Sequence, residues 1–309
     1  MSMIKISETV QMAYEIAAEK LGDGECASYI PALAKADPRL LAVSVTDTKG
    51  STFSTGDSKA RFTLQSISKV ILLATALKEA GFEKVFSRVR MEPSGDPFNS
   101  IVRLETVNPC PSNPMINAGA IAVTSCIPGE SAAERFDKVL TFARKILDNP
   151  LLDYDRDVYA SESSNSARNQ ALAYMMEATK VIPAPVSEHL EIYFKACSLL
   201  VNCEEISYLG AVLANDGISP RTGEEYLGHR DVKTIRALMA TCGLYDHSGE
   251  FAVRVGIPAK SGVGGGIMGA VPGKLGIGTF CPALDSKGNS ICGQRAFEVL
   301  SEELDLSVF

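Results

Sequence analysis

Ser66-Ile67-Ser68-Lys69 lies between a strand-like run that ends at Gly56 and an apolar helical run that ends near Gly81. A serine and a lysine three residues apart at the start of a helix lie on one face, one turn apart. The lysine amine can then take the proton of the serine hydroxyl, which makes the serine a better nucleophile. Backbone N–H groups at a helix start also suit a developing oxyanion. The spacing indicates a serine nucleophile, but such pairs are common, so the hypothesis needs support from the rest of the chain.

The segments around this tetrapeptide predict a buried helix and a hairpin. Apolar residues cover nearly all faces of the run from Ser66 to Ala80, which is typical of a helix inside a large domain. Such a helix is a rigid support for a catalytic pair. Before it, alternating apolar residues on both sides of a turn at residues 47–50 predict an antiparallel hairpin over residues 41–55.

The chain changes character at about residue 82. Helical runs separated by loops fill residues 82–243, and strand patterns return after Gly243. We therefore predict an α+β fold in which an antiparallel sheet is flanked by helices. Residues 1–81 and 244–309 form a discontinuous sheet subdomain, residues 82–243 an all-α subdomain, and the active site lies in the cleft between them. The predicted elements include helices at Ser7–Leu21, Ala132–Leu147, Ala167–Ala178, Val186–Leu200, Glu204–Ala214 and Val232–Cys242, and strands at Ile267–Val271 and Leu275–Phe280.

The composition excludes several classes of protein. A net charge of −7 and a pI near 5.2 argue against nucleic acid and anionic membranes as partners. The N-terminus lacks the apolar core of a signal peptide and no apolar run is long enough to span a membrane, so we expect a soluble cytoplasmic protein. Eight cysteines without a C-x-x-C pair and three histidines show no zinc spacing, so we expect no metal and read the cysteines as buried reduced thiols.

A glycine-rich stretch near the C-terminus supports the serine hypothesis. Lys260-Ser261-Gly262 precedes Val263 and three further glycines. In enzymes with the S-x-x-K pattern, a K-[ST]-G triplet on a strand faces the nucleophile. Its lysine adds positive charge, and the glycines let a backbone N–H point at an oxyanion. A glycine-rich turn with a solvated lysine is the alternative interpretation.

Two further groups of polar residues are candidates for the same site. Tyr245 beside a lysine can relay a proton, although a tyrosine that packs between subdomains would look the same. Asn117, Glu162 and Asn169 suit an amino-acid head group, since a carboxylate binds an ammonium and amides bind a carboxylate. Helix caps and solvated loops are the alternative for these three residues.

Taken together, the motifs resemble those of the serine-dependent glutaminases in their short bacterial form. The resemblance covers nearly the whole chain from about Tyr29. It implies a β-lactamase/transpeptidase-like fold and the hydrolysis of L-glutamine to L-glutamate and ammonia, without a metal or organic cofactor, often in a homotetramer. The stretches that carry it are residues 62–69, 113–121, 161–162, 168–169, 243–246 and 260–266.

The resemblance also implies a role for individual residues. Ser66 matches the nucleophile, Lys69 the group that activates it and Tyr245 a proton carrier. Lys260 matches the strand lysine that faces the cleft. Val263 matches the residue whose backbone N–H binds the oxyanion together with that of Ser66. The positions that match substrate contacts are Tyr29, Asn117, Glu162, Asn169 and Tyr193, of which Tyr29 and Tyr193 rest on short local motifs.

Two other functions remain open from the sequence. A β-lactamase, DD-peptidase or esterase would share the S-x-x-K and K-[ST]-G motifs, but the chain lacks an S-D-N motif and a signal peptide. A catalytically silent relative that binds an amino acid would have no need of the Ser66, Lys69, Tyr245 and Lys260 set.

Overall fold

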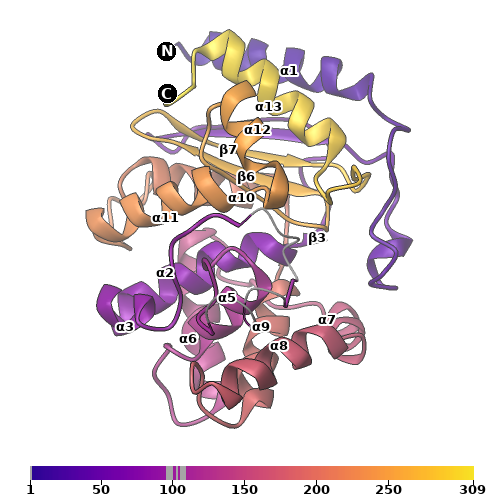
Figure 1. Ribbon diagram of the computed structural model, residues 1–309. Coiled ribbons are helices and arrows are strands. Elements are labelled where there is room, and N and C mark those ends of the chain that lie inside the picture. The colour runs from indigo at the N-terminus through magenta and orange to yellow at the C-terminus, as the bar shows by residue number, and fades with distance from the viewer. Residues whose placement is uncertain (1, 95–99, 102–103, 105–108) are drawn as a thin grey trace.

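The computed structural model describes all residues except 1, 95–99, 102–103 and 105–108. Within the predicted helical region 82–243, residues 95–99, 102–103 and 105–108 therefore lie outside the described residues. A five-stranded antiparallel sheet crosses the molecule in Figure 1 in the order β2-β1-β7-β6-β5. Strands from both ends of the chain pair at its centre, where Ser44 of β1 lies opposite Gly278 of β7. The strands are β1 (Ala42–Asp47), β2 (Thr52–Gly56), β5 (Ala259–Ser261), β6 (Gly266–Val271) and β7 (Leu275–Phe280).

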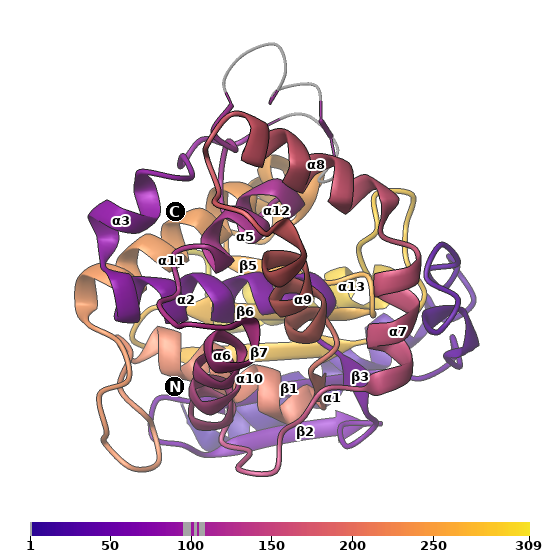
Figure 2. The ribbon, with the colours of Figure 1, turned by 90° about the horizontal axis from the view of Figure 1, so that it is seen from below.

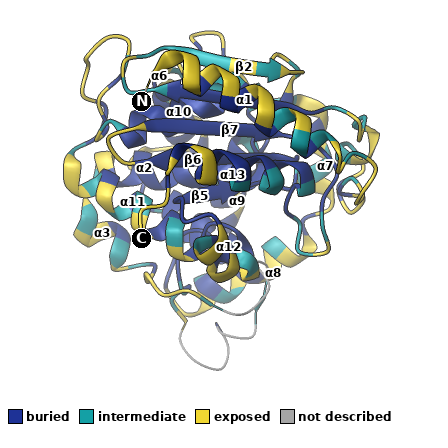
Figure 3. Ribbon diagram, turned by 90° about the horizontal axis from the view of Figure 1, so that it is seen from above, coloured by how far each residue is buried: buried dark blue, intermediate teal, exposed yellow. Residues whose placement is uncertain are grey.

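Helices cover both faces of this sheet. α1 (Met3–Ala18) and α13 (Ile291–Leu304) lie on one face, beside the two chain ends, and α10 (Cys203–Ala214) lies on the other (Figure 1). α10 packs closely because β7 presents glycines to it: a Cβ on Gly276 would lie 2.0 Å from the Ala211 backbone nitrogen. Figure 3 shows the strands β6 and β7 buried and the outer side of α1 exposed.

The remaining helices include α2 (Ser68–Ala80), whose residues from Ser68 to Leu77 are all buried. Figure 2 shows this helix near the centre of the helical layer, and it contacts α5, α6, α9 and α11. None of the helices in the described part of the chain is long and apolar enough to cross a membrane. The helices other than α1, α2, α10 and α13 are α3 (Phe82–Phe86), α5 (Asn117–Thr124), α6 (Ala132–Ile146), α7 (Arg156–Ser164), α8 (Ala167–Ala178), α9 (Val186–Cys197), α11 (His229–Cys242) and α12 (Ser248–Arg254).

The predicted hairpin and C-terminal strands are confirmed, but several helix boundaries are corrected. The first helix spans Met3–Ala18 instead of Ser7–Leu21, and the helix predicted from Val232 begins at His229. Residues Gln65–Ile67 form a 3-10 turn, η2, and α2 begins after it. The helix predicted over Val186–Leu200 ends at Cys197, because Leu200–Val201 forms strand β4, which pairs with β3 (Phe62–Thr63). Residues 82–243 are therefore not all helical. Their assignment to a separate subdomain stays a prediction. One helix of this region, α10, packs on the sheet.

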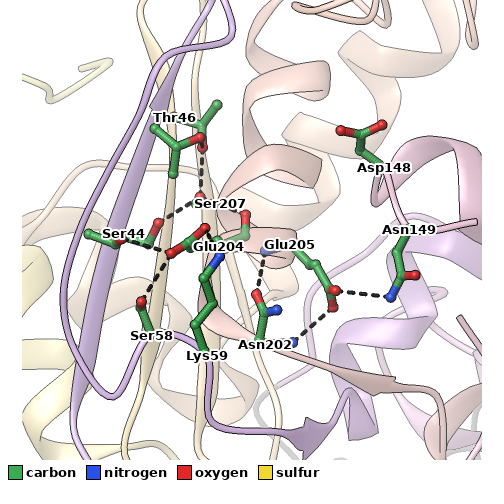
Figure 4. Close-up of polar contacts among 12 residues, drawn as sticks. Ser44, Thr46, Ser58, Lys59, Asp148, Asn149, Asn202, Glu204, Glu205 and Ser207 are labelled. Carbon is green, nitrogen blue, oxygen red and sulfur yellow. Dashed lines mark hydrogen bonds and ion pairs between the residues drawn. The ribbon is translucent and has the colours of Figure 1, made fainter. Parts of the chain in front are cut away.

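Two adjacent carboxylates at the start of α10 hold the segment that leads to Ser66 (Figure 4). Glu204 accepts hydrogen bonds from Ser54, Ser58 and Lys59, the last at 2.6 Å. Glu205 accepts from Arg61 and from Asn149 of the helical layer, each at 2.9 Å. Together with the β3–β4 pair, these bonds fix the backbone immediately before the candidate nucleophile.

Candidate active site

The structure brings Ser66 and Lys69 into direct contact. Lys69 Nζ donates to Ser66 Oγ at 2.6 Å, and both side chains are buried. Burial lowers the pKa of Lys69 to about 8, because water no longer solvates the ammonium, while Cys197 and Glu162 act in the opposite direction. A larger fraction of the amine is therefore neutral near pH 7 than for an exposed lysine, as a general base requires.

The backbone next to Ser66 is strained. Gln65 has φ +48°, a left-handed conformation that residues other than glycine rarely adopt. The conformation is held by its side chain, which is buried, donates to Thr63 Oγ1 at 3.2 Å and hydrogen-bonds Glu162. Strain of this kind persists where the surroundings fix it, often at functional sites.

Tyr245 also contacts Ser66. It begins the short turn η3 (Tyr245–His247) with φ +56°. Its hydroxyl is hydrogen-bonded to Ser66 and donates to Ser261 O at 3.4 Å. Burial raises the pKa of Tyr245 to about 12, and these two hydrogen bonds reduce the effect. The phenol is therefore protonated at neutral pH and can pass a proton along the chain of hydrogen bonds.

Lys260 packs against the Tyr245 ring. Its buried amine lies 4.3 Å from the centroid of the Tyr245 ring and donates to the backbone oxygens of Gly243 and Ser261 at 2.8 and 2.7 Å. Burial, with the nearby Lys69, lowers the pKa of Lys260 well below its ordinary value. The resemblance implies that Lys260 is the strand lysine that faces the cleft, and its catalytic role stays a prediction; in the structure its amine is hydrogen-bonded to two carbonyls beside Tyr245.

The glycine-rich loop after β5 packs directly on the backbone around Ser66. A Cβ on Gly262 would lie 2.6 Å from Leu64 O and 3.3 Å from the Ser66 nitrogen, and a Cβ on Gly264 would lie 2.6 Å from Thr63 O. Side chains at these two positions would force the two segments apart. The glycines therefore bring the Val263 backbone close to Ser66, as an oxyanion site formed by both N–H groups requires.

Three helices contribute a polar group on the far side of Lys69. Asn117 Nδ2 donates to Asn169 Oδ1 at 3.0 Å, and Tyr193 Oη donates to Asn117 Oδ1 at 3.1 Å. The Tyr193 ring lies 5.5 Å from Lys69 Nζ. Asn117 is the first residue of α5, where the helix dipole favours a negative ligand.

Glu162 and Tyr29 complete the predicted set. Burial raises the pKa of Glu162 to about 7, while Lys69 and a hydrogen bond from Gln65 act in the opposite direction. The Tyr29 side chain is 57% exposed. Its pKa is nevertheless raised, first by burial and then by the proximity of Tyr245 and Glu162, so Tyr29 lies at the edge of the site. Its loop is linked to α7 by a hydrogen bond from Ala32 N to Ser161 Oγ.

Sequence reasoning missed Cys197 and the role of Gln65. The Cys197 thiol is buried, accepts a hydrogen bond from Ser68 at 3.6 Å and is hydrogen-bonded to Tyr193. Burial and then Glu162 raise its pKa to about 11, so the thiol is neutral. Its place one helical turn after Tyr193 was a signal in the sequence. In the described part of the chain, no group of His, Cys, Asp and Glu side chains is placed to hold a metal.

Comparison with known proteins identifies the family. A family model described as Glutaminase matches residues 24–309. Glutaminase 2 of Clostridium perfringens (strain 13 / Type A) is 50% identical over 287 residues, 93% of this chain and 94% of that protein. The solved structure of a probable glutaminase, ybaS, superposes with a TM-score of 0.96 at 38% identity and covers 100% of this chain and 99% of that one.

A second solved structure carries a bound compound. The Bacillus subtilis glutaminase YbgJ, in a covalent complex with 5-oxo-L-norleucine formed by reaction with 6-diazo-5-oxo-L-norleucine, superposes with a TM-score of 0.87 at 37% identity. The match covers 99% of both chains. With a family model that spans nearly the whole sequence and relatives of this similarity, the chain belongs to the glutaminase family.

Proposed function

We propose that the protein hydrolyses the side-chain amide of L-glutamine to L-glutamate and ammonia through an ester of Ser66. The observation that carries the proposal is the 2.6 Å contact between Lys69 Nζ and Ser66 Oγ, next to the Tyr245 hydroxyl. The covalent complex of the relative YbgJ with 5-oxo-L-norleucine supports a covalent step in the reaction.

The acylation half-reaction follows from these contacts. Lys69, directly or through Tyr245, takes the proton of Ser66 Oγ, which attacks the side-chain carbonyl carbon of glutamine. The N–H groups of Ser66 and Val263 stabilise the resulting oxyanion. The carbon–nitrogen bond then breaks, and the proton held by Lys69 and Tyr245 passes to the leaving nitrogen, which departs as ammonia. Water cleaves the ester by the same steps in reverse, and the proton returns to Ser66.

The polar residues opposite Lys69 bind the amino-acid head group in this proposal. Glu162 accepts the ammonium of glutamine, whose positive charge also keeps the carboxylate ionised despite its raised pKa. Asn117, Asn169 and Tyr193 surround the α-carboxylate at the start of α5. Tyr29 contacts the substrate at the edge of the site, near Glu162 and Tyr245.

The same geometry favours this activity over the two alternatives. A β-lactamase, DD-peptidase or esterase would share the Ser66–Lys69 pair, but the amide pair and Glu162 match a free ammonium and carboxylate. A protein that only binds an amino acid would not need a buried lysine amine in contact with a serine hydroxyl, since burying an amine is costly.

Assembly and location are further parts of the proposal. We infer a homo-oligomer, a dimer or a tetramer, in the cytoplasm, and the resemblance to short bacterial glutaminases supports both. Light scattering on the purified protein tests the first, and a mass equal to one chain at all concentrations would contradict it. Cell fractionation tests the second, and recovery outside the cytoplasm would contradict it.

Replacement of Ser66 by alanine tests the proposed chemistry. We expect Ser66→Ala to reduce ammonia release from glutamine by several orders of magnitude, because nucleophile and base act as a unit. The matched control is Ser68→Ala, which removes a buried hydroxyl that donates to Gln65 O on the same turn. We expect the control to keep most of its activity. Near-normal turnover by a homogeneous, folded Ser66→Ala preparation would overturn the proposal.

A further inference from the structure

Two buried cysteines are in contact at the start of α13. Cys281 directly follows the strand β7, and Cys292 is the second residue of α13. Both side chains are 0% exposed, and their thiols are hydrogen-bonded to each other. A backbone pair between Leu284 and Ser290 holds together the two ends of the turn that separates the cysteines. Such fixed proximity is what a disulfide requires, since its sulfur atoms lie about 2.05 Å apart.

The surroundings of Cys281 favour its reactive form. The hydrogen bond with Cys292 lowers the pKa of Cys281, hydrogen bonds with Ala283 and Ser290 act in the same direction, and burial opposes them. The same contact with Cys281, together with burial, raises the pKa of Cys292, so Cys292 keeps its proton. Because the thiolate and not the thiol attacks an oxidant, Cys281 is the more nucleophilic member of the pair.

A hollow gives a small oxidant a route to the pair. Its volume is about 270 Å³, and it is lined by the half-buried Cys26 and by both chain neighbours of Cys281, Phe280 and Pro282. Cys26 lies near Cys281, since burial and then the charge of Cys281 raise the pKa of Cys26. Hydrogen peroxide is little larger than water, which occupies about 30 Å³ in the liquid, so the hollow has room for it.

Polar atoms that can bind a small molecule lie next to Cys292. Among the described side chains, Thr279 Oγ1 and both amide atoms of Asn289 are buried without a hydrogen-bond partner. A Cβ on Gly293, the residue after Cys292, would lie 2.8 Å from Thr279 Oγ1. Asn289 directly precedes Ser290, the N-cap residue of α13. Buried polar groups are nearly always hydrogen-bonded, so these atoms suit a small polar molecule such as a peroxide.

The cysteine pair is linked to the proposed oxyanion site. Cys281 N donates to Gly265 O at 3.0 Å, and Gly265 belongs to the same glycine-rich loop as Val263. Within the turn between the cysteines, a Cβ on Gly288 would lie 3.5 Å from a methyl group of Val263 and 3.7 Å from the Tyr245 ring. A new bond that moves either end of this turn therefore displaces the backbone that holds the oxyanion residue.

We propose that Cys281 and Cys292 form an oxidation-sensitive pair, which hydrogen peroxide converts to a disulfide that lowers the activity of the enzyme. The Cys281 thiolate attacks one peroxide oxygen, the oxygen–oxygen bond breaks, and a sulfenic acid forms as hydroxide leaves and takes up the proton of the original thiol. The Cys292 sulfur then attacks the Cys281 sulfur, the sulfur–oxygen bond breaks, and the Cys292 proton leaves with the hydroxyl as water. Two thiols are oxidised by two electrons, and the peroxide is reduced to two waters. Transient disulfides of this kind act as redox sensors in reducing compartments.

Peptide mass spectrometry tests whether the bond forms. Trypsin cleaves after Lys274, Lys287 and Arg295, so the two cysteines fall in separate peptides. After treatment of the purified protein with hydrogen peroxide, we expect these two peptides to be linked with the loss of two hydrogens, and dithiothreitol to separate them. Two unlinked peptides with reduced thiols, or a link from Cys281 to Cys26, would overturn the inference.

The rate of ammonia release tests the effect of the bond. We expect oxidation to lower kcat about tenfold or more, since the loss of one oxyanion donor can cost about 100-fold, and dithiothreitol to restore it. Cys292→Ser should have wild-type activity and keep it in peroxide. The matched control is Cys203→Ser, which changes an equally buried thiol that donates to Gly278 O at 3.1 Å. This control should stay sensitive to peroxide, and equal reversible inactivation of Cys292→Ser would overturn the inference.

The outcomes separate this inference from the proposed function. The effect on turnover rests on the proposed Ser66 chemistry, whereas the linked peptides are detected without any activity. If Cys292→Ser does not fold, Cys281→Ser takes its place, and the mass measurement on the wild type needs no variant. If the disulfide forms and kcat does not change, the inference fails and the proposed function stands. If Ser66→Ala still hydrolyses glutamine, the proposed function itself fails.

Discussion

The activity of this enzyme should rise steeply between pH 6 and pH 8, because two buried groups must both lose a proton. Lys69 must be neutral to accept the Ser66 proton, and burial lowers its pKa to about 8. Glu162 must be charged to pair with the substrate ammonium, and burial raises its pKa to about 7. Acid therefore inactivates the enzyme twice, by protonating the base and by neutralising the carboxylate.

The size of the rise follows from these two pKa values. The fraction of enzyme with both groups deprotonated is about 0.001 at pH 6 and about 0.45 at pH 8, an increase on the order of 500-fold. An enzyme in which only Lys69 titrates would show a rise of about 50-fold over the same range. A lysine with an ordinary pKa would keep gaining activity well above pH 9 instead of levelling off.

The measurement is kcat/KM for ammonia release from glutamine, since this parameter reports the pKa values of the free enzyme. Glu162→Gln removes one of the two titrations, so its rise from pH 6 to pH 8 should be at most about 50-fold. The midpoint should also move below pH 8, because the Glu162 charge raises the pKa of Lys69 in the wild type. At pH 8 the variant should raise KM roughly tenfold or more through the lost charged pair.

A matched variant separates this effect from a general change of charge. Glu224 pairs with Lys145 on the surface at 2.9 Å, so Glu224→Gln removes a carboxylate far from the proposed chemistry and should keep the wild-type profile. If kcat/KM depends on pH in the same way for the wild type and Glu162→Gln, and KM is unchanged, Glu162 does not bind the substrate ammonium. A wild-type profile that does not level off by pH 9 would refute the lowered pKa of Lys69.

Two further variants test the same cluster. Lys69→Met should be inactive but more stable by up to about 3 kcal/mol at pH 7, the free energy that corresponds to the fall of the Lys69 pKa from 10.5 to about 8. Between these two pKa values the unfolded chain binds more protons than the folded one, so the stability of the wild type rises with pH and the advantage of the variant shrinks. Thermal unfolding of both proteins at pH 7 and pH 10 measures this change. A variant that is less stable than the wild type at pH 7 would contradict it. Tyr245→Phe should lower kcat about 100-fold or more with a smaller change in KM, because the ring stays on Lys260 while the relay hydroxyl is lost. A kcat within threefold of the wild type would remove Tyr245 from the mechanism.

The parts of the fold that depend on local patterns could be predicted from the sequence. The hairpin at residues 41–55 shows alternating apolar residues, and Ile267–Val271 and Leu275–Phe280 are short apolar runs joined by a clear turn; the structure confirms these strands. The two-residue strand Leu200–Val201 could not be predicted in this way, because it is too short to show a period and is defined by its partner, Phe62–Thr63.

The candidate site likewise contains some contacts that local sequence spacing predicts and others that it does not. The approach of Lys69 to Ser66 follows from helical spacing, so it could be expected from the four residues Ser66–Lys69 alone. The contact of Asn117 with Asn169 and Tyr193 joins three separate helices, and no local pattern encodes it. The left-handed conformation of Gln65 was equally inaccessible, since glutamine has no preference for it and the surrounding contacts impose it.

The central claim is that Ser66 is the residue that forms the covalent intermediate, and a mapped adduct tests it most directly. The reagent is 6-diazo-5-oxo-L-norleucine, which forms a covalent complex with the relative YbgJ. Peptide mass spectrometry of the treated protein should place one adduct on Ser66, with fragment ions that exclude Ser68, and Ser66→Ala should remain unmodified. An adduct on the buried thiol of Cys197, or on any residue other than Ser66, would contradict the account.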